Sequence, residues 1–483
     1  STYLSNIYAK SHKMGFYGSS PDTDKGSLFK FESTTVEGSY YYLKLKDYYE
    51  NQAKVAGSNI QGGKAVGYYP VAEAGVYNAA YAAATEALAN EEITDDECQI
   101  AYNNLVAANE ALEINMPEEG KYYVIRSAHT GYAANKLMYA TGENAIRWDL
   151  NKTQVNPEAV WTFTSEGYLE NLNTGCAVNT NGGEAKLGTA PKTISIKGIG
   201  EDGQVLLTPA GGTPLHADWH GHAVSWGTYD VGSASAWRIV EVTEKELSNV
   251  QFVLNIGQYR HAGLYLNYTT KIPEGVQVYI AHSSTEGAVI ADELEGTILP
   301  ARTAAIVKGN QGTYNFMYTT ADYDGKDAEA FTDNVLGGSA YLKYQQVKKQ
   351  GNRCCVFGQK NGEVGLYKNY VQYVDANGST TVEEGKGEQK VVIADHKNSD
   401  NGTHFKISPN KIYFEYDPIT VSNATAFTFR LNDKTTGLDR LMMDGDTVIY
   451  DLYGRRLVEI VAPGFYVING KKIYVTEKMI GNK

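Results

Sequence analysis

The residues with the most obvious chemistry lie in one short segment, 216–229. Its first half contains three histidines and one carboxylate, His216, Asp218, His220 and His222. Imidazole nitrogens on a hairpin can converge on zinc, which accepts histidine and aspartate ligands. Neither a fourth ligand nor the groups that would orient these histidines can be assigned from the sequence, so an exposed turn is the favoured interpretation. We therefore expect no metal and no cofactor.

The same segment has the residue types that bind carbohydrate. A sugar ring packs its C–H face on a flat aromatic side chain, and a carboxylate or amide binds its hydroxyls, because each hydroxyl must recover the hydrogen bonds that it made to water. A carboxylate occurs beside aromatic residues both here and once upstream. The expected carbohydrate-binding residues are Asp218, Trp219, Trp226, Tyr229, Trp148 and Asp149. The alternative is that these aromatic residues belong to a core.

Catalytic motifs are missing from the sequence. It has no phosphate-binding Gly-Lys-Ser/Thr loop, no Gly-x-Ser-x-Gly elbow and no His-Glu-x-x-His helix. A glycosidase needs two carboxylates across a groove, and the sequence cannot identify that pair among 56 acidic residues. Acidic loops at 22–26 and 322–327 resemble calcium loops, but they lack the closing glutamate of an EF-hand, which favours solvated turns. We expect no enzyme activity in this chain.

Three stretches within residues 118–243 position these side chains, and they can be aligned with one another. They begin at Tyr122, Gly167 and Val205, and each has a strand, a turn with glycine and a second strand. The closing strands are 159–163, 194–197 and 235–240. A period of about 40 residues that occurs three times predicts a barrel of threefold symmetry with a hairpin cap.

Tryptophans stand in two of these closing strands, Trp161 and Trp237. In this respect the region resembles the ricin-type β-trefoil family, which places a tryptophan in the closing strand of its repeats. The resemblance covers about a quarter of the chain and implies a fold suited to holding carbohydrate. The glutamine that usually lies two residues before the tryptophan is replaced by Ala159 and Ser235. This departure concerns the sugar site more than the fold, because the tryptophan is expected to belong to the core.

Residues 67–117 have a helical period instead. Two apolar faces recur at intervals of three and four residues: Tyr77, Tyr81, Ala84 and Leu88, then Ala101, Leu105, Ala108 and Leu112. Between them, Thr94 and Glu97 have the spacing of a capping box. We expect one short helical hairpin, which resembles the small helical modules between domains of bacterial surface proteins and glycan-degrading enzymes. Its expected role is that of a spacer.

The regions on either side are expected to be β-rich. Residues 1–66 have strand-like runs at 3–7, 27–31 and 40–45, which predict a partial module, with an incomplete trefoil as one interpretation. In residues 244–420, Pro and Gly turns separate strand-like runs, as at 263–268, 272–279, 295–301, 304–309, 361–368 and 410–414. This pattern is similar to β-sandwich modules of Bacteroidota surface proteins.

The last region, 421–483, contains Tyr-Asp-Leu-Tyr-Gly-Arg-Arg at 450–456, Pro-Gly-Phe-Tyr at 463–466 and Asn-Gly-Lys-Lys at 469–472. Asn-Gly is a strong hairpin signal, so we expect a small meander. Its predicted buried face consists of Phe465, Val467, Ile473 and Val475. The signature closely resembles the C-terminal β-domain of Bacteroidota secreted proteins, akin to the type IX sorting domain, which implies export.

Composition limits the remaining possibilities. A chain of 483 residues suggests three or four domains, and a net charge of -13 without a basic run argues against a nucleic-acid partner. No stretch of about 18 apolar residues occurs, so no membrane span is expected. The four cysteines have no disulfide or zinc spacing and are expected to be buried free thiols. Because the chain opens on a strand-like run without a signal sequence, we interpret it as part of something longer.

Taken together, the sequence predicts a mainly β protein: a β-trefoil plus β-sandwich modules, with one short helical hairpin. The expected function is that of a non-catalytic carbohydrate-binding or adhesive region of a secreted or outer-membrane surface protein, with a glycan or glycoprotein as its partner. Two alternatives stay open. The chain could be the accessory part of a glycoside hydrolase or peptidase whose catalytic domain lies upstream, or a structural spacer without a ligand.

Overall fold

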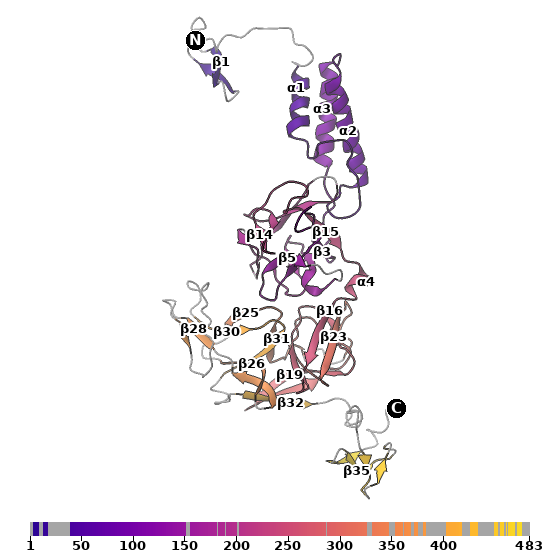
Figure 1. The fold of residues 1–483 in the computed structure, drawn as a ribbon, viewed down its shortest axis with the longest axis vertical. Helices are drawn as coiled ribbons and strands as arrows, with labels where there is room; N and C mark the ends of the chain where they lie inside the picture. The colour runs from indigo at the N-terminus through magenta and orange to yellow at the C-terminus, as the bar shows by residue number, and fades with distance from the viewer. Residues whose placement is uncertain are drawn as a thin grey trace. The chain divides into compact units, whose positions relative to one another are not determined.

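The structure is a computed structural model of the chain. It describes residues 3–8, 13–17, 39–150, 155–180, 182–188, 190–199, 202–285, 287–325, 331–346, 353–360, 362–368, 371–374, 380–382, 402–417, 426–432, 449–452, 455–457, 460, 462–468 and 471–475. Strands outnumber helices among the elements, so the chain is mainly β, as predicted (Figure 1). Two compact units can be separated, the first made mainly of residues before Met116 and the second mainly of those after it.

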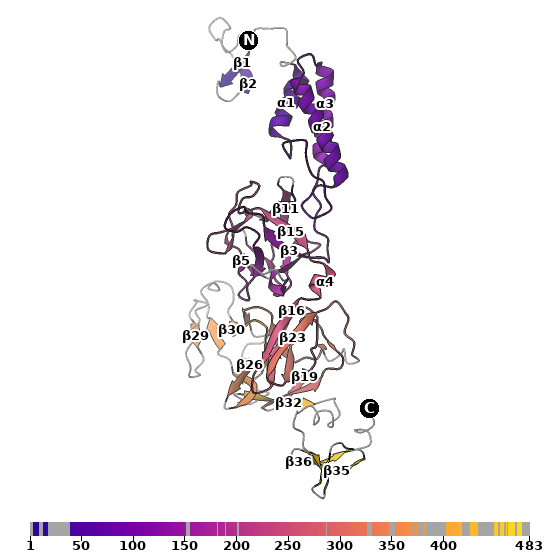
Figure 2. The same cartoon turned by 45° about the vertical axis from the view of Figure 1, so that its right-hand side comes forward.

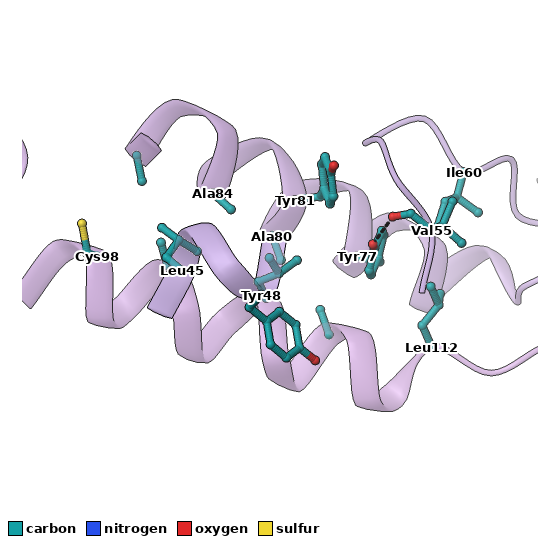
Figure 3. Close-up of a cluster of buried hydrophobic side chains, with 14 of the residues drawn as sticks. Leu45, Tyr48, Val55, Ile60, Tyr77, Ala80, Tyr81, Ala84, Cys98 and Leu112 are labelled. Atoms are coloured by element: carbon teal, nitrogen blue, oxygen red, sulfur yellow. Dashed lines mark hydrogen bonds between the residues drawn. The ribbon is translucent and has the colours of Figure 1, made fainter. Parts of the chain in front are cut away.

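The first unit contains three helices that lie side by side, α1 (Tyr40–Asn51), α2 (Val71–Ala89) and α3 (Asp95–Ala111) (Figures 1 and 2). Tyrosine and alanine side chains dominate their shared core (Figure 3). The buried hydroxyl of Tyr77 is satisfied because it donates to the carbonyl of Val55. The faces predicted for α2 and α3 are confirmed, and so is the capping box of Thr94 and Glu97.

Helix α1 replaces the strand predicted at 40–45, and this prediction is wrong. The run of tyrosines has high strand propensity, but Tyr42, Leu45 and Tyr48 are buried at a spacing of three residues on one helical face. The α1 amide of Tyr41 donates to Asp95 Oδ1 at 2.7 Å, so α3 satisfies one of its unpaired N–H groups. The helical part therefore begins near Tyr40 and is a three-helix bundle, not a hairpin.

Before α1, the strand predicted at 3–7 is confirmed as β1 (Tyr3–Tyr8), which pairs antiparallel with β2 (Lys13–Tyr17). The strand predicted at 27–31 and the acidic loop at 22–26 lie outside the described residues.

Six strands of residues 118–243 pair antiparallel in the order β7 (Leu169–Asn171), β6 (Val160–Phe163), β3 (Tyr122–Ser127), β15 (Trp237–Glu241), β12 (Val205–Pro209) and β11 (Ile194–Gly198). β3 pairs with β6, β6 with β7, β11 with β12, β12 with β15, and β15 with β3. A single bridge between Tyr168 and Thr193, the residues just before β7 and β11, joins the two ends of this row into a ring.

Three hairpins, one per predicted repeat, connect the strands of this ring. They are β4 (Leu137–Ala140) with β5 (Ile146–Leu150), β8 (Ala177–Val178) with β10 (Leu187–Gly188), and β13 (Leu215–Ala217) with β14 (Ala223–Ser225). Bridges Ala145–Lys186 and Arg147–His222, and the pairing of β14 with β9 (Gly183–Glu184), link each hairpin to the other two. We call these three hairpins the cap.

Two tryptophans occupy equivalent places in the core of the ring. Trp161 and Trp237 are fully buried, and their Nε1–H groups donate to the carbonyls of Met138 at 3.1 Å and Leu215 at 2.8 Å. Each indole therefore ties a closing strand to the first strand of its own cap hairpin. The prediction that these tryptophans belong to the core is confirmed.

Residues after α4 (Glu244–Leu247) form further sheets. A four-stranded sheet has the order β16 (Gln251–Ile256), β23 (Gly312–Tyr318), β18 (Thr270–Lys271) and β21 (Ile298–Leu299). A nine-stranded sheet has the order β17 (His261–Leu264), β22 (Ala305–Gly309), β19 (Val276–Thr285), β20 (Ala288–Glu293), β32 (Ala426–Asn432), β27 (Glu363–Lys368), β26 (Arg353–Lys360), β31 (Lys411–Tyr416) and β24 (Leu336–Ser339). A third sheet contains β25 (Lys343–Gln346), β30 (Gly402–Ile407), β28 (Val371–Val374) and β29 (Thr380–Val382).

Two apolar cores stabilise these sheets, in keeping with sandwich packing. Strands β16 and β23 of the four-stranded sheet pack on β17, β19 and β22, whereas the second core joins distant strands of the nine-stranded sheet itself. In that sheet β32 runs parallel to β20 and antiparallel to β27. The sandwich region therefore extends beyond residue 420, where the sequence placed its end.

A four-stranded antiparallel sheet of β33 (Ile449–Tyr450), β34 (Arg456–Leu457), β35 (Gly464–Ile468) and β36 (Lys471–Val475) follows, in the order β34, β33, β35, β36. A small antiparallel sheet is present as predicted, but it is not a meander, because β35 pairs with β33 and not with β34. The predicted buried face is also wrong. Ile468 pairs with Lys471, so Phe465 lies opposite Tyr474 and shares a face with it, while Ile473 and Val475 line the other, buried face with Ile468. The turn at 469–470 lies outside the described residues.

Other sequence expectations concern cysteines and membrane spans. All four cysteines are buried and free, as predicted. Among the described residues, no helix combines the length and the apolar character that crossing a bilayer requires.

Candidate carbohydrate-binding site

Trp219 is the most exposed large aromatic residue of the predicted site. It lies in the turn of the third cap hairpin, and 79% of its surface is open to solvent. Its indole stacks on the ring of Tyr132, with centroids 4.6 Å apart and an angle of 23° between the planes. Tyr132 comes from the connection between β3 and β4 and donates its hydroxyl to the carbonyl of Ala217 at 2.6 Å. One face of the Trp219 indole is thus covered by the ring of Tyr132, and the other is left for solvent or a ligand.

Asp218 shapes the turn that carries Trp219. Its Oδ1 accepts the backbone N–H groups of His220 at 2.9 Å and His222 at 2.7 Å. This arrangement closes the turn around Gly221, which has a φ of 84° that favours glycine. Asp218 Oδ2 makes no such backbone bond and lies 3.6 Å from His222 Nδ1. One carboxylate oxygen is therefore structural, and the other is the one that a ligand could use.

A second carboxylate approaches the same imidazole. Glu184 Oε1, on the exposed strand β9 of the second repeat, is 3.1 Å from His222 Nδ1. Pairing of β9 with β14 places these side chains next to each other. His222 with Asp218 and Glu184 forms a polar group beside the turn of Trp219.

The histidines do not converge on a metal. His216 is buried and its Nδ1 shares a hydrogen bond of 2.8 Å with the hydroxyl of Ser235. Burial lowers the pKa of His216, and nearby His129 lowers it further, which favours the neutral imidazole. Among the described residues, no group of three or more His, Cys, Asp or Glu side chains is arranged to hold a metal ion.

Trp226 and Tyr229 lie further along the third repeat. Trp226 is 67% exposed and its ring lies 5.0 Å from that of His216, and Tyr229 is 60% exposed. Both were predicted to face a ligand, and both present their rings to solvent. His216 connects this second aromatic platform to the core through its hydrogen bond with Ser235.

Trp148 and Asp149 of the first repeat play a different part. Trp148 is only 5% exposed, so the prediction that its ring faces a sugar does not agree with the structure. Its ring lies 5.6 Å from that of Tyr132, so it supports the Tyr132 and Trp219 stack from the core side. Its Nε1 has no hydrogen-bond partner among the described residues.

Asp149 is next to the turn of the third hairpin. A Cβ added to Gly221 would lie 3.3 Å from the Asp149 carboxyl carbon, and the hydroxyl of Tyr139 donates to Asp149 Oδ1 at 3.0 Å. Burial, followed by this hydrogen bond, raises the pKa of Tyr139 to about 12. Asp149 Oδ2 lies beside Gly221 and therefore adds a third acidic group to the site.

Trp219 stacked on Tyr132 forms an aromatic platform. Its polar border consists of Asp218, Glu184, His222 and Asp149. An aromatic platform with a polar border is the arrangement that sugar binding requires. Sequence reasoning found Trp219 and Asp218 but missed Tyr132 and Glu184. Both missed residues come from other repeats and reach the site only because the cap hairpins pair with one another. The alignment of the three repeats was the sequence signal from which the proximity of Tyr132 and Glu184 to Trp219 could have been predicted.

The acidic loop near residue 322 serves the fold. Asp324 accepts hydrogen bonds from the amide and hydroxyl of Thr297 at 2.8 and 2.7 Å and from the amide of Ile298 at 3.2 Å. These bonds lower the pKa of Asp324, the hydroxyl of Thr297 contributing most. The carboxylate thus holds the turn before β21 in place.

Comparisons with known proteins give no family for this chain. The sequence matches no protein family, and it matches no curated protein.

Proposed function

We propose that residues 118–243 are a β-trefoil of the ricin type and that its cap binds carbohydrate. The closed ring of six strands, the three cap hairpins that contact each other, and the equivalent positions of Trp161 and Trp237 support the trefoil. In a trefoil, the cap hairpins and the loops beside them present side chains to a ligand. Tyr132, Asp218 and Trp219 all lie in such places.

The observation that carries the carbohydrate proposal is the stacking of Trp219 on Tyr132. An exposed indole costs solvation free energy unless it serves a contact, and a large apolar ring held still at the surface is typical of a binding residue. Because Tyr132 covers one face, the other remains for the C–H face of a sugar. A ring fixed in advance loses little conformational entropy when a ligand binds.

Polar groups beside the platform supply the hydroxyl partners. His222 Nδ1 lies 3.1 Å from Glu184 Oε1 and 3.6 Å from Asp218 Oδ2, and Asp149 approaches from the first repeat. Carboxylates accept two sugar hydroxyls strongly, since hydrogen bonds to charged groups are short and strong. A neutral sugar with adjacent hydroxyls fits this set better than an acidic one.

The test is a glycan array probed with the whole chain, followed by calorimetry on the best ligand. We expect Trp219→Ala to weaken binding about tenfold or more, because the stacking platform is lost. Tyr474→Ala, which removes an exposed aromatic residue from the C-terminal sheet, is the matched control and should bind like the parent. An array without signal from the parent chain would instead favour a spacer without a ligand.

We also propose that the chain is a non-catalytic part of an exported bacterial protein. The sequence signature at 450–456, 463–466 and 469–472, in the region of the small sheet of β33 to β36, supports the resemblance of the tail to a sorting-type domain. Expression of the complete gene product with an epitope next to Lys483, followed by fractionation, tests export. Recovery of the intact protein from the cytoplasm alone would contradict it. A catalytic domain upstream would make this chain its carbohydrate-binding accessory.

A further inference from the structure

The sandwich region has a pocket of about 520 Å³ that is separate from the candidate carbohydrate-binding site. Its walls combine three aromatic rings, an arginine, an amide and glycine backbone: Tyr265, Arg302, Phe331, Asn334, Gly338 and Tyr413. Ligand pockets in proteins usually measure about 300–1,000 Å³. The volume is therefore enough for one or two sugar rings.

The pocket lies where the two ends of the nine-stranded sheet approach each other. Tyr265 directly follows the end strand β17, and Gly338 belongs to the opposite end strand, β24. A Cβ on Gly338 would collide with the ring of Tyr265, and one on Gly337 would collide with the ring of Tyr413. The two glycines thus allow the tyrosine rings to lie directly against the strand backbone.

Arg302 is held in a fixed position at the pocket. Its φ of 59° is in the left-handed region, which is uncommon for a residue with a side chain. Its amide donates to the carbonyl of Leu266 at 2.7 Å, and its Nε donates to Asn267 Oδ1 at 2.9 Å. The two bonds fix both the backbone and the near side of the guanidinium.

The far side of this guanidinium forms one long ion pair. Glu170 Oε1 lies 3.8 Å from Nη2, which is within ion-pair distance but beyond hydrogen-bond distance. An arginine fork binds a carboxylate through two parallel N–H groups. The amide of Asn334 is occupied, since it donates to Ala304 and accepts from Leu336, so Arg302 is the group that can select a ligand.

We propose that this pocket binds a sugar ring with a carboxylate, that is, a uronate. Arg302 pairs with the carboxylate, the rings of Tyr265 and Phe331 pack on the C–H groups, and the Tyr265 phenol exchanges hydrogen bonds with ring hydroxyls. This site differs from the cap in its chemistry, because the cap groups near Trp219 are mainly acidic and this pocket has a cation.

Calorimetry of the whole chain with sodium glucuronate and galacturonate tests the proposal. We expect at least one uronate to bind about tenfold or more tightly than glucose or galactose, since the neutral sugars lack the charged partner. Arg302→Gln should remove that preference, and Arg302→Lys should keep part of it. Arg430→Gln, an exposed arginine on β32, is the matched control and should bind like the parent.

Several results would overturn the proposal. These are equal affinity for uronate and neutral sugar, an Arg302→Gln variant that is folded by circular dichroism and still prefers uronate, and tighter binding of benzoate than of either uronate. Trp219→Ala is expected to leave uronate binding unchanged. A loss of neutral-glycan binding in that variant alone would therefore concern the cap, and a loss of uronate binding in the Arg302 variants alone would concern this pocket.

Discussion

The indole of Trp219 lies on the phenol ring of Tyr132, although the two residues belong to different repeats of the same region. Tyr132 is anchored at its other end by the hydrogen bond from its hydroxyl to Ala217, in the strand that leads to Trp219. The stack therefore fixes the turn of the third cap hairpin to the loop of the first repeat. Support of this kind makes the platform rigid without burying it.

Two substitutions separate the roles of ring and hydroxyl at Tyr132. Tyr132→Phe keeps the stack and loses one hydrogen bond, so we expect a loss of about 1 kcal/mol in the free energy of unfolding with nearly unchanged glycan affinity. Tyr132→Ala removes the support, and we expect glycan affinity to fall about as much as in Trp219→Ala. Denaturant unfolding and calorimetry measure the two effects. Full affinity in a folded Tyr132→Ala variant would show that the stack is not needed.

Trp237 is expected to contribute much more to stability than Trp226. Trp237→Phe deletes the Nε1–H that donates to Leu215 in a fully buried place, leaving an unpaired carbonyl and a small cavity. We expect a loss of about 2–4 kcal/mol. Trp226→Phe, at an exposed position, should change stability by less than about 0.5 kcal/mol. All five tryptophans lie between Trp148 and Trp237, so their fluorescence follows the unfolding of this region.

Acid should loosen the three-helix bundle through Glu97. Hydrogen bonds from the amide and then the hydroxyl of Thr94 lower the pKa of Glu97 in the folded state. A carboxyl with a lowered pKa adds stability that is complete above its unfolded value and is lost as pH falls through the folded value. We expect helical circular dichroism in mild denaturant to decline between about pH 5 and pH 3.

Two variants control for this effect. Glu97→Gln keeps a capping-box side chain without a titrating group and should show a weaker decline with acid. Thr94→Ala should cost about 1 kcal/mol at neutral pH because the cap is removed. If the acid response of Glu97→Gln equals that of the parent, the capping carboxylate is not its source.

The four cysteines should be unreactive in the native protein. Each is buried, and burial raises the pKa of the Cys98 and Cys354 thiols, which reduces the thiolate needed for attack. We expect less than about one thiol per chain to react with Ellman's reagent before unfolding, and all four to react in guanidinium. Fast native labelling at two or more sites would contradict the described burial.

Local signals in the sequence predicted much of the fold. The strands of the ring, the capping box at Thr94 and the core positions of Trp161 and Trp237 follow from spacing and residue type, and the structure agrees with them. The strand predicted at residues 40–45 failed because the burial of Leu45 depends on packing against α2 and α3, which no local propensity contains.

The prediction of the buried face of the C-terminal sheet failed in a different way. Because Ile468 pairs with Lys471, each odd-numbered residue of β35 pairs with an even-numbered residue of β36. Paired residues lie on the same face of a sheet, so Phe465 and Ile473, both odd-numbered, lie on opposite faces. Only part of the candidate site was predicted, because pairing between distant segments also determines which residues meet there. Trp219 could be found by its residue type, whereas Tyr132 and Glu184 come close only through pairing between hairpins that are distant in sequence.

Strand β32 has a consequence for how the protein is made. It is the only described strand that joins the half of the nine-stranded sheet ending at β20 to the half ending at β27, and it is the last of the nine to leave the ribosome. Until Asn432 emerges, both halves expose unpaired edges of the kind that promotes aggregation. We therefore expect the nine-stranded sheet to form only after β32 has been synthesised, and we expect chaperones or rapid translation to limit aggregation of the exposed edges until then.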